Sequence, residues 1–161
     1  MSYRGRALSS ITRFEKVLSE LNVAAEVLEL PQSTRTAKEA AEAIGCELAQ
    51  IAKSLVFQSA DSRVPVLIIA SGPNRVQEKM IAEYLKTSIM MADPDFVRSV
   101  TGYAIGGVPP FGHTEPLQTI IDEDLLDFQL IWAAAGTPRS VFSIEPQKLV
   151  EITNAEVMAV S

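Results

Sequence analysis

The chain has 161 residues, of which 47% are hydrophobic, and it carries a formal net charge of −6 at pH 7. This length and composition suit one domain with a substantial core and require no second domain. The acidic balance argues against a protein that holds nucleic acid by a broad basic surface, because phosphate contacts need clustered lysine and arginine. Any contact with RNA is therefore expected to be local.

The single cysteine, Cys46, excludes both an internal disulfide and a metal site built from cysteines. A reducing cytoplasm is the simplest setting for such a chain. The basic N-terminus is not followed by a long apolar run, so the sequence predicts neither a signal peptide nor a membrane-spanning helix. We expect no cofactor and favour a monomer, although no pattern in the sequence reports on assembly.

The first part of the chain predicts two helices around a strand. Apolar residues three and four positions apart predict a helix over about 9–21, within a leading segment 1–22. A strand is expected at 24–30. A capping-box pattern, in which a glutamate follows a threonine by three residues, then begins a helix over 36–44.

The middle of the chain predicts two buried strands and a helix. Apolar runs at 53–59 and 64–71 are expected to be strands joined by a polar turn. Asn74 is expected to cap a helix over 75–86, and a short strand near 88–92 follows.

The last part of the chain is arranged around a loop rich in glycine and proline. Asp93 and Pro94 have the pattern of an N-cap and a first-turn proline, which predicts a helix to about residue 100. Beyond the loop we expect strands at 117–122, 129–135 and 140–144 and a helix from Pro146. Because strands and helices alternate irregularly, the sequence predicts a single α+β domain with a mixed, curled, barrel-like sheet flanked by helices.

The loop over 101–113 is the most informative segment, because it holds four glycines, two prolines and the only histidine. Glycine permits backbone angles closed to other residues, and Pro109 and Pro110 fix φ and lack N–H donors. We expect a stiff loop that presents the amides of Gly106, Gly107 and Val108 to a ligand. Taken alone, such a loop is more often an ordinary turn between strands.

A second residue, Lys53, favours a ligand-binding loop over an ordinary turn. The run Ala52-Lys53-Ser54-Leu55-Val56-Phe57, the loop from Thr101 to Gly112 and the strand Leu117-Gln118-Thr119-Ile120-Ile121-Asp122 together resemble the YbaK/prolyl-tRNA synthetase-associated family of aminoacyl-tRNA editing domains. The resemblance extends from about Val23 to the end of the chain. The loop carries the family's Gly-x-x-x-Pro signature as Gly106 to Pro110.

The resemblance implies a cytoplasmic hydrolase that removes a small, wrongly attached amino acid from tRNA in trans. The implied substrate is tRNA-Pro, bound by its aminoacylated 3′ end, and prolyl-tRNA synthetase is a candidate partner. Lys53 would anchor that end through phosphate, and the three loop amides would stabilise the oxyanion formed when water attacks the ester. The remaining expected substrate-binding residues are Thr101, Gly102, Pro109, Pro110, Phe111, Gly112, His113 and Arg139.

Several side chains admit two interpretations. His113 is either a general base or a loop histidine bonded to the backbone, and no nucleophile can be placed beside it. Arg139 is either a second phosphate contact or a surface turn residue. Cys46 is expected to be a structural thiol and Trp132 a core residue, and the acidic residues Asp122, Glu123, Asp124 and Asp127 are expected in a solvated turn.

The identity of the amino acid stays open. Some relatives carry an aromatic residue after the first strand, at or near the position of Leu30 in this chain, and some carry an acidic residue in the strand after Arg139, where this chain has none. Two other functions also stay open. A binding module would hold an aminoacyl-RNA end or a nucleotide without hydrolysis, and a hydrolase of small esters or thioesters would act without RNA.

Overall fold

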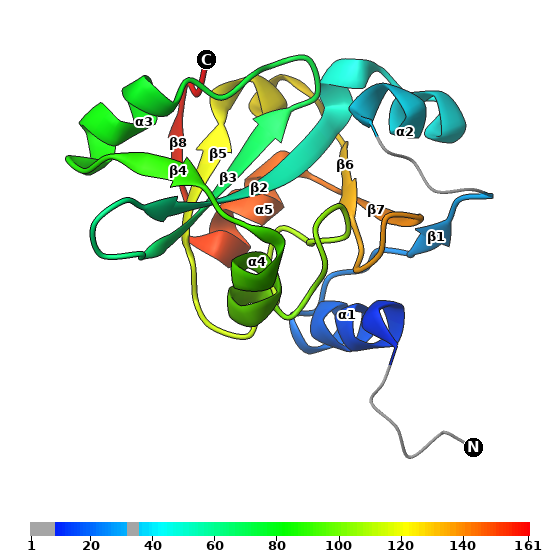
Figure 1. The fold of residues 1–161 in the computed structure, drawn as a ribbon. Coiled ribbons are helices and arrows are strands. Elements are labelled where there is room, and N and C mark those ends of the chain that lie inside the picture. Colours follow the sequence, from blue (N-terminus) through cyan, green and yellow to red (C-terminus); the bar gives the residue numbers. More distant parts are fainter. Residues whose placement is uncertain (1–8, 32–35) are drawn as a thin grey trace.

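The computed structural model describes residues 9–31 and 36–161 (Figure 1). Its helices are α1 (Ser10–Glu20), α2 (Ala37–Ile44), α3 (Glu78–Leu85), α4 (Pro94–Thr101) and α5 (Pro146–Thr153), with 3-10 turns at Leu48–Gln50 and Glu123–Asp127. Its strands are β1 (Leu28–Glu29), β2 (Ile51–Ser59), β3 (Pro65–Ser71), β4 (Ile89–Met91), β5 (Gln118–Asp122), β6 (Ile131–Ala134), β7 (Ser140–Ile144) and β8 (Glu156–Met158). No helix in these two stretches is long and apolar enough to cross a bilayer. Residues 1–8 of the leading segment lie outside the described residues.

The strands form one mixed sheet in the order β1-β7-β6-β2-β3-β5-β8, with β4 paired to β2. The pairs β2–β6, β3–β5 and β5–β8 are parallel, and the other pairs are antiparallel. The predicted α+β class and mixed sheet are confirmed. The sheet stays open, with β1 and β8 at its two ends, and does not close into a barrel.

Strand β3 is an inner strand of the sheet, between β2 and β5, and is buried on both faces. Leu67 and Ile69 pack on the face covered by α1, α4 and α5, and Ile68 packs on the opposite face, against Ile81 of α3. Figure 1 shows α1 and α4 on one side of the sheet and α3 on the other. An uninterrupted apolar run is the expected pattern for a strand buried in this way.

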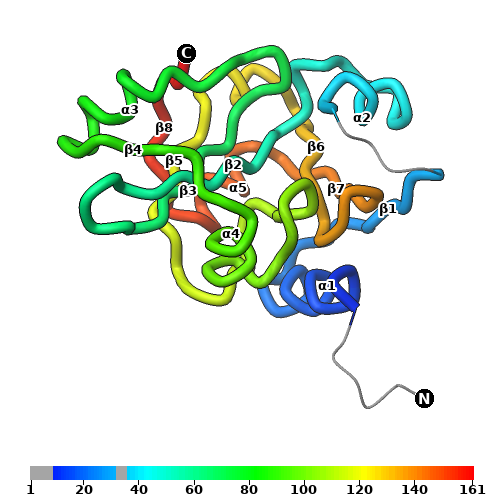
Figure 2. The backbone as a smooth tube through the Cα atoms, viewed as in Figure 1, coloured from blue at the N-terminus to red at the C-terminus, as the bar shows by residue number. Residues whose placement is uncertain are grey.

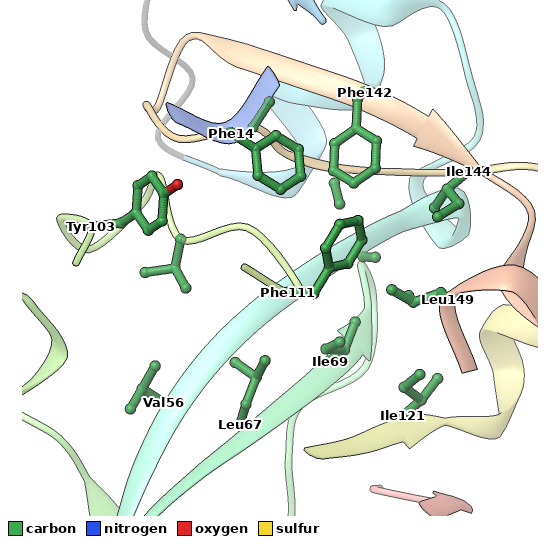
Figure 3. Close-up of a cluster of buried hydrophobic side chains, with 14 of the residues drawn as sticks. Phe14, Val56, Leu67, Ile69, Tyr103, Phe111, Ile121, Phe142, Ile144 and Leu149 are labelled. Carbon is green, nitrogen blue, oxygen red and sulfur yellow. The ribbon is translucent and has the colours of Figure 1, made fainter. Parts of the chain in front are cut away.

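Three phenylalanine rings join α1, the glycine loop and β7 (Figure 3). The ring centroid of Phe14 lies 5.3 Å from that of Phe111 and 4.9 Å from that of Phe142, and the last two lie 5.9 Å apart. Tilted and edge-on pairs at such distances are favourable beyond their buried area. The opening helix is therefore built into the core beside the loop.

Strand β2 has an interrupted edge. Its β3 side is paired from Ala52 to Gln58. On the other side, β6 pairs only with Ile51 and Ala52, and β4 pairs only with residues 57–59. Residues 53–56 therefore have a neighbouring strand on one side alone, and the gap between β6 and β4 opens beside them.

Two predicted elements differ in the structure, and one strand was not predicted. The helix predicted at 75–86 begins at Glu78, and Gln77 takes the N-cap position expected for Asn74. The strand predicted at 24–30 is reduced to the two residues of β1. Strand β8 was not predicted, because its three residues show no alternation long enough to distinguish from a coil.

Candidate active site

A cavity of about 290 Å³ lies in the gap between β6 and β4. Its walls are β2 from Ile51 to Val56, the start of α2, the facing parts of β6 and β7, and the tip of the glycine loop. The lining is mainly apolar, and small side chains such as Ala52 and Ala133 form part of its wall. A cavity of this kind suits a small ligand group fixed by a few polar atoms.

Ser54 supplies polar groups to this cavity. The carbonyl of Val56 accepts a hydrogen bond from the amide of Ala92, at 3.1 Å, so even-numbered residues of this stretch turn their backbone groups away from β3. The backbone of Ser54 therefore faces the gap. Its hydroxyl is shielded from solvent and has no hydrogen-bond partner among the residues that the structure describes. No sequence pattern marks Ser54 as a site residue except its place next to Lys53.

The tip of the glycine loop is a tight turn. The amide of Gly107 donates to the carbonyl of Ala104, at 3.0 Å, and Gly106 has a φ of +90°, which favours glycine. Of the three amides predicted to face a ligand, the Gly107 amide is thus occupied in the turn. Within the described residues, the amides of Gly106 and Val108 have no acceptor, and both residues line the cavity.

Gly107 allows the loop to pack directly against the backbone of Gly136 and Thr137. A Cβ atom at this position would lie 2.7 Å from Cα of Thr137 and 2.9 Å from the carbonyl oxygen of Gly136. Gly136, with a φ of +113°, is pressed in the same way against the carbonyl of Ser10 at the start of α1. Three backbone segments are therefore stacked without intervening side chains.

Helix α1 supports the beginning of the loop. The guanidinium of Arg13 donates to the carbonyl of Gly102, at 2.9 Å, and lies 4.6 Å from the ring centroid of Tyr103. The hydroxyl of Thr101 donates to Val97 in α4 and also accepts from the amide of Tyr103. Figure 2 shows the loop passing beside α1 and β7 on its way to β5. Thr101 and Gly102 thus hold the loop in place from outside the cavity lining.

The second half of the loop is packed into the protein. Pro109, Pro110 and Phe111 are buried, and none of them lines the cavity. Gly112 has a φ of +82°, and a Cβ there would press on Val17 of α1. These four residues stay predictions as substrate contacts, and their contacts in the structure are with the core and with α1.

His113 is held by the loop that it closes. Its Nε2 lies 2.7 Å from the carbonyl oxygen of Pro109. Burial lowers the pKa of the imidazole, and the bond to Pro109 opposes this only in part, which favours the neutral ring with the proton on Nε2. The imidazole donates this proton to a backbone carbonyl and lies outside the cavity lining. This arrangement favours a loop histidine with a structural role over a general base.

Lys53 is half-buried in the cavity wall. Its ammonium donates to the backbone carbonyl of Asn74, at 2.7 Å. Burial lowers the pKa of this ammonium, the carboxylate of Asp122 acts to raise it, and Arg75 acts to lower it. Lys53 is therefore a partly desolvated cation held in one position beside the cavity.

The structure also locates the acidic residues at the end of β5 and the side chain of Arg139. Asp122 is 1% exposed, so the solvated turn expected there was wrong for this residue, although Glu123, Asp124 and Asp127 are exposed. Arg139 donates to the carbonyls of Leu30 and Pro31, at 3.3 and 3.2 Å, and its phosphate contact stays a prediction.

Cys46 and Trp132 both pack against a small apolar cluster of Ala40 and Ala41 in α2 and Ile51 in β2. Cys46 is half-buried against this small apolar cluster and does not line the cavity, and burial raises the pKa of its thiol. Trp132 is half-buried and forms part of the cavity wall, so the prediction of a plain core residue was wrong.

The profile of the aminoacyl-tRNA editing domain matches residues 31–152. The chain is 34% identical over 132 residues to the uncharacterized protein YwhH of Bacillus subtilis (strain 168), and the match covers 82% of this chain and 83% of YwhH. It is 32% identical over 94 residues to a proline–tRNA ligase of Limosilactobacillus fermentum (strain NBRC 3956 / LMG 18251), which covers 56% of this chain and 16% of the ligase.

Solved structures agree with these matches. One described as a candidate trans-editing enzyme for prolyl-tRNA synthetase has 43% identity and a TM-score of 0.89, with 96% of this chain and 99% of that chain covered. The structure of hypothetical protein APE2540 has 25% identity and a TM-score of 0.85, with 92% and 98% covered. From sequence and fold together, this chain belongs to the aminoacyl-tRNA editing domain family.

Proposed function

We propose that this protein is a trans-editing deacylase that hydrolyses the ester between a small amino acid and the 3′ terminus of tRNA, with tRNA-Pro as its substrate. One observation carries the proposal. Lys53 lines a single, mainly apolar cavity together with Gly106 and Val108, two residues whose amides have no acceptor among residues 9–31 and 36–161. The family and its relation to prolyl-tRNA synthetase support the choice of substrate.

The residues at the cavity suit hydrolysis by water. Water attacks the ester carbonyl, the amides of Gly106 and Val108 stabilise the oxyanion, and the ester C–O bond breaks as the ribose oxygen takes up a proton. One such donor contributes about 3 kcal/mol in enzymes that use it. In this reaction water takes the place of a side-chain nucleophile; Cys46 lies outside the cavity lining, and Nε2 of His113 is bonded to the carbonyl of Pro109. A group of the substrate, such as the neighbouring ribose hydroxyl, would orient the water.

Lys53 would bind the RNA end. A compact ammonium suits a phosphate oxygen, and partial desolvation strengthens the attraction. The acidic surface of the chain limits RNA contacts to this locality. Selection among amino acids would come from the size of the cavity, since a methylene group changes rates by only about 10–200-fold, and synthetases for small amino acids need a second site of this kind.

The test is deacylation of tRNA-Pro charged separately with alanine, cysteine, serine, threonine, 2-aminobutyrate and proline. We expect release of one or two small residues, no release of proline, and loss of activity in Lys53→Ala but not in Lys16→Ala, a charge-matched variant on the exposed face of α1. Binding without release would instead identify a binding module. Turnover of free amino-acid esters at the same rate as charged tRNA would identify a small-ester hydrolase.

A further inference from the structure

Asp122 is a buried carboxylate at the end of β5, and the proposed reaction does not use it directly. Its Oδ2 accepts from the amide of Ser71, at 3.0 Å, and from the side-chain amide of Asn74, at 2.8 Å. Its Oδ1 accepts from the amide of Asp124, at 3.0 Å. A buried charge is tolerated only where such bonds replace water. The arrangement therefore fixes this carboxylate and the groups bonded to it.

Asn74 connects this carboxylate to the cavity. Its side-chain NH₂ group has two hydrogens, and they are shared between Asp122 and Asp124, at 2.8 and 2.7 Å. Its backbone carbonyl accepts the bond from the Lys53 ammonium, at 2.7 Å. Both donor positions of the amide are satisfied by carboxylates, which explains why an asparagine stands here and an aspartate would not serve.

The loop that carries Asn74 is also held at its other end. The hydroxyl of Ser71 donates to the carbonyl of Ala49, at 2.6 Å, and the amide of Asn74 donates to the carbonyl of Ser71, at 2.9 Å. A Cβ atom on Gly72 would overlap the carbonyl oxygen of Leu48, so the two segments are in close contact. The carbonyl that receives Lys53 therefore has a fixed position.

We propose that Asp122 is a positioning residue which, by tethering Asn74, holds the Lys53 ammonium in the place where it binds the RNA end. Lysine has a flexible four-carbon stem, and a cation without a fixed acceptor loses binding energy to side-chain disorder. The negative charge of Asp122 also favours the charged form of Lys53, in opposition to burial and Arg75. This inference rests on the proposed function, in which Lys53 contacts substrate.

The test uses Asn74→Ala, which removes the tether but keeps the carbonyl, together with Asp122→Asn and the control Asp127→Asn. Asp127 is an exposed acidic residue after β5, so its variant matches the charge change. We expect Asn74→Ala and Asp122→Asn each to raise KM for charged tRNA by about 10-fold with a smaller change in kcat, and Asp127→Asn to leave both unchanged. Thermal melting of each variant shows whether it is folded.

Binding of an RNA minihelix that ends in a nonhydrolysable 3′-alanylamido adenosine distinguishes tethering from a general structural effect. If Asn74 acts through Lys53, Asn74→Ala weakens binding in the wild-type background but not in Lys53→Ala. Folded Asn74→Ala with wild-type KM, or an equal loss in both backgrounds, would overturn the inference while leaving the proposed function intact. A fully active Lys53→Ala would instead overturn the proposed role of Lys53 itself.

Discussion

The close approach of Gly107 to the backbone of Thr137 gives a sharp prediction for Gly107→Ala. The new Cβ would lie 2.7 Å from Cα of Thr137, whereas ordinary contact begins at 3.4 Å. The two segments must therefore separate by about 0.7 Å, and neither contact atom is the end of a flexible side chain. Overpacking of this kind costs about 1–3 kcal/mol. It would lower the melting temperature of a chain of this length by roughly 2–12 °C.

The same shift displaces the two amides at the cavity. A misplacement of about 1 Å can reduce a rate about 100-fold, so kcat/KM for deacylation should fall by that order. The control is Gly45→Ala, where φ is +86° but no atom lies within 4 Å of the new Cβ. Its backbone strain costs about 1–2 kcal/mol at a site away from the cavity, so it should lose stability but not activity. If Gly107→Ala loses stability and keeps full activity, the loop position does not control the reaction and the reasoning is refuted.

Three further variants test the surroundings of the loop and cavity. Ser54→Ala removes a buried hydroxyl without a partner, so urea denaturation should show a gain of about 1 kcal/mol; a loss would mean that the hydroxyl is bonded. Arg13→Ala removes the bond to the Gly102 carbonyl and should cost about 1–3 kcal/mol and reduce deacylation, while the exposed Lys16→Ala changes neither. Burial lowers the pKa of His113 in the folded state below the ordinary value of 6.5, so the unfolded chain takes up a proton first and stability is lost as pH falls through 6.5. Denaturation at pH 7.5 and 5.5 should show a smaller pH dependence in His113→Gln than in wild type, and equal slopes would contradict the burial argument.

Local patterns predicted the elements whose signals are local. The capping box of Thr36 and Glu39 and the N-cap of Asp93 are both present in the structure, because each bond joins residues three positions apart. Asn74 failed as an N-cap because its side chain is bonded to Asp122 and Asp124, 48 and 50 residues away. Distant partners of this kind leave no trace in the spacing of the sequence.

The residues of the candidate site divide in the same way, into those marked by a local motif and those placed by contacts between distant segments. Lys53 and the tip of the loop were recognisable from the family motif, and the structure places Lys53, Gly106 and Val108 around one cavity. The contribution of Trp132 depends on which strand lies beside β2, and the place of Asp122 depends on the loop after β3. Both follow from strand order in a mixed sheet, which periodicity does not encode.

Because the edge of β2 is interrupted, the number of paired residues on β6 and β4 sets the width of the pocket. Two more paired residues on β6 or β4 would halve the four-residue gap at 53–56, and two fewer would open it to a larger group, since each residue advances a strand by about 3.3 Å. Side-chain substitutions at small lining residues such as Ala52 and Ala133 would change the volume in finer increments. Insertion or deletion in the segments that lead into these two strands would change the opening in whole steps, so both kinds of change bear on which group the pocket accepts.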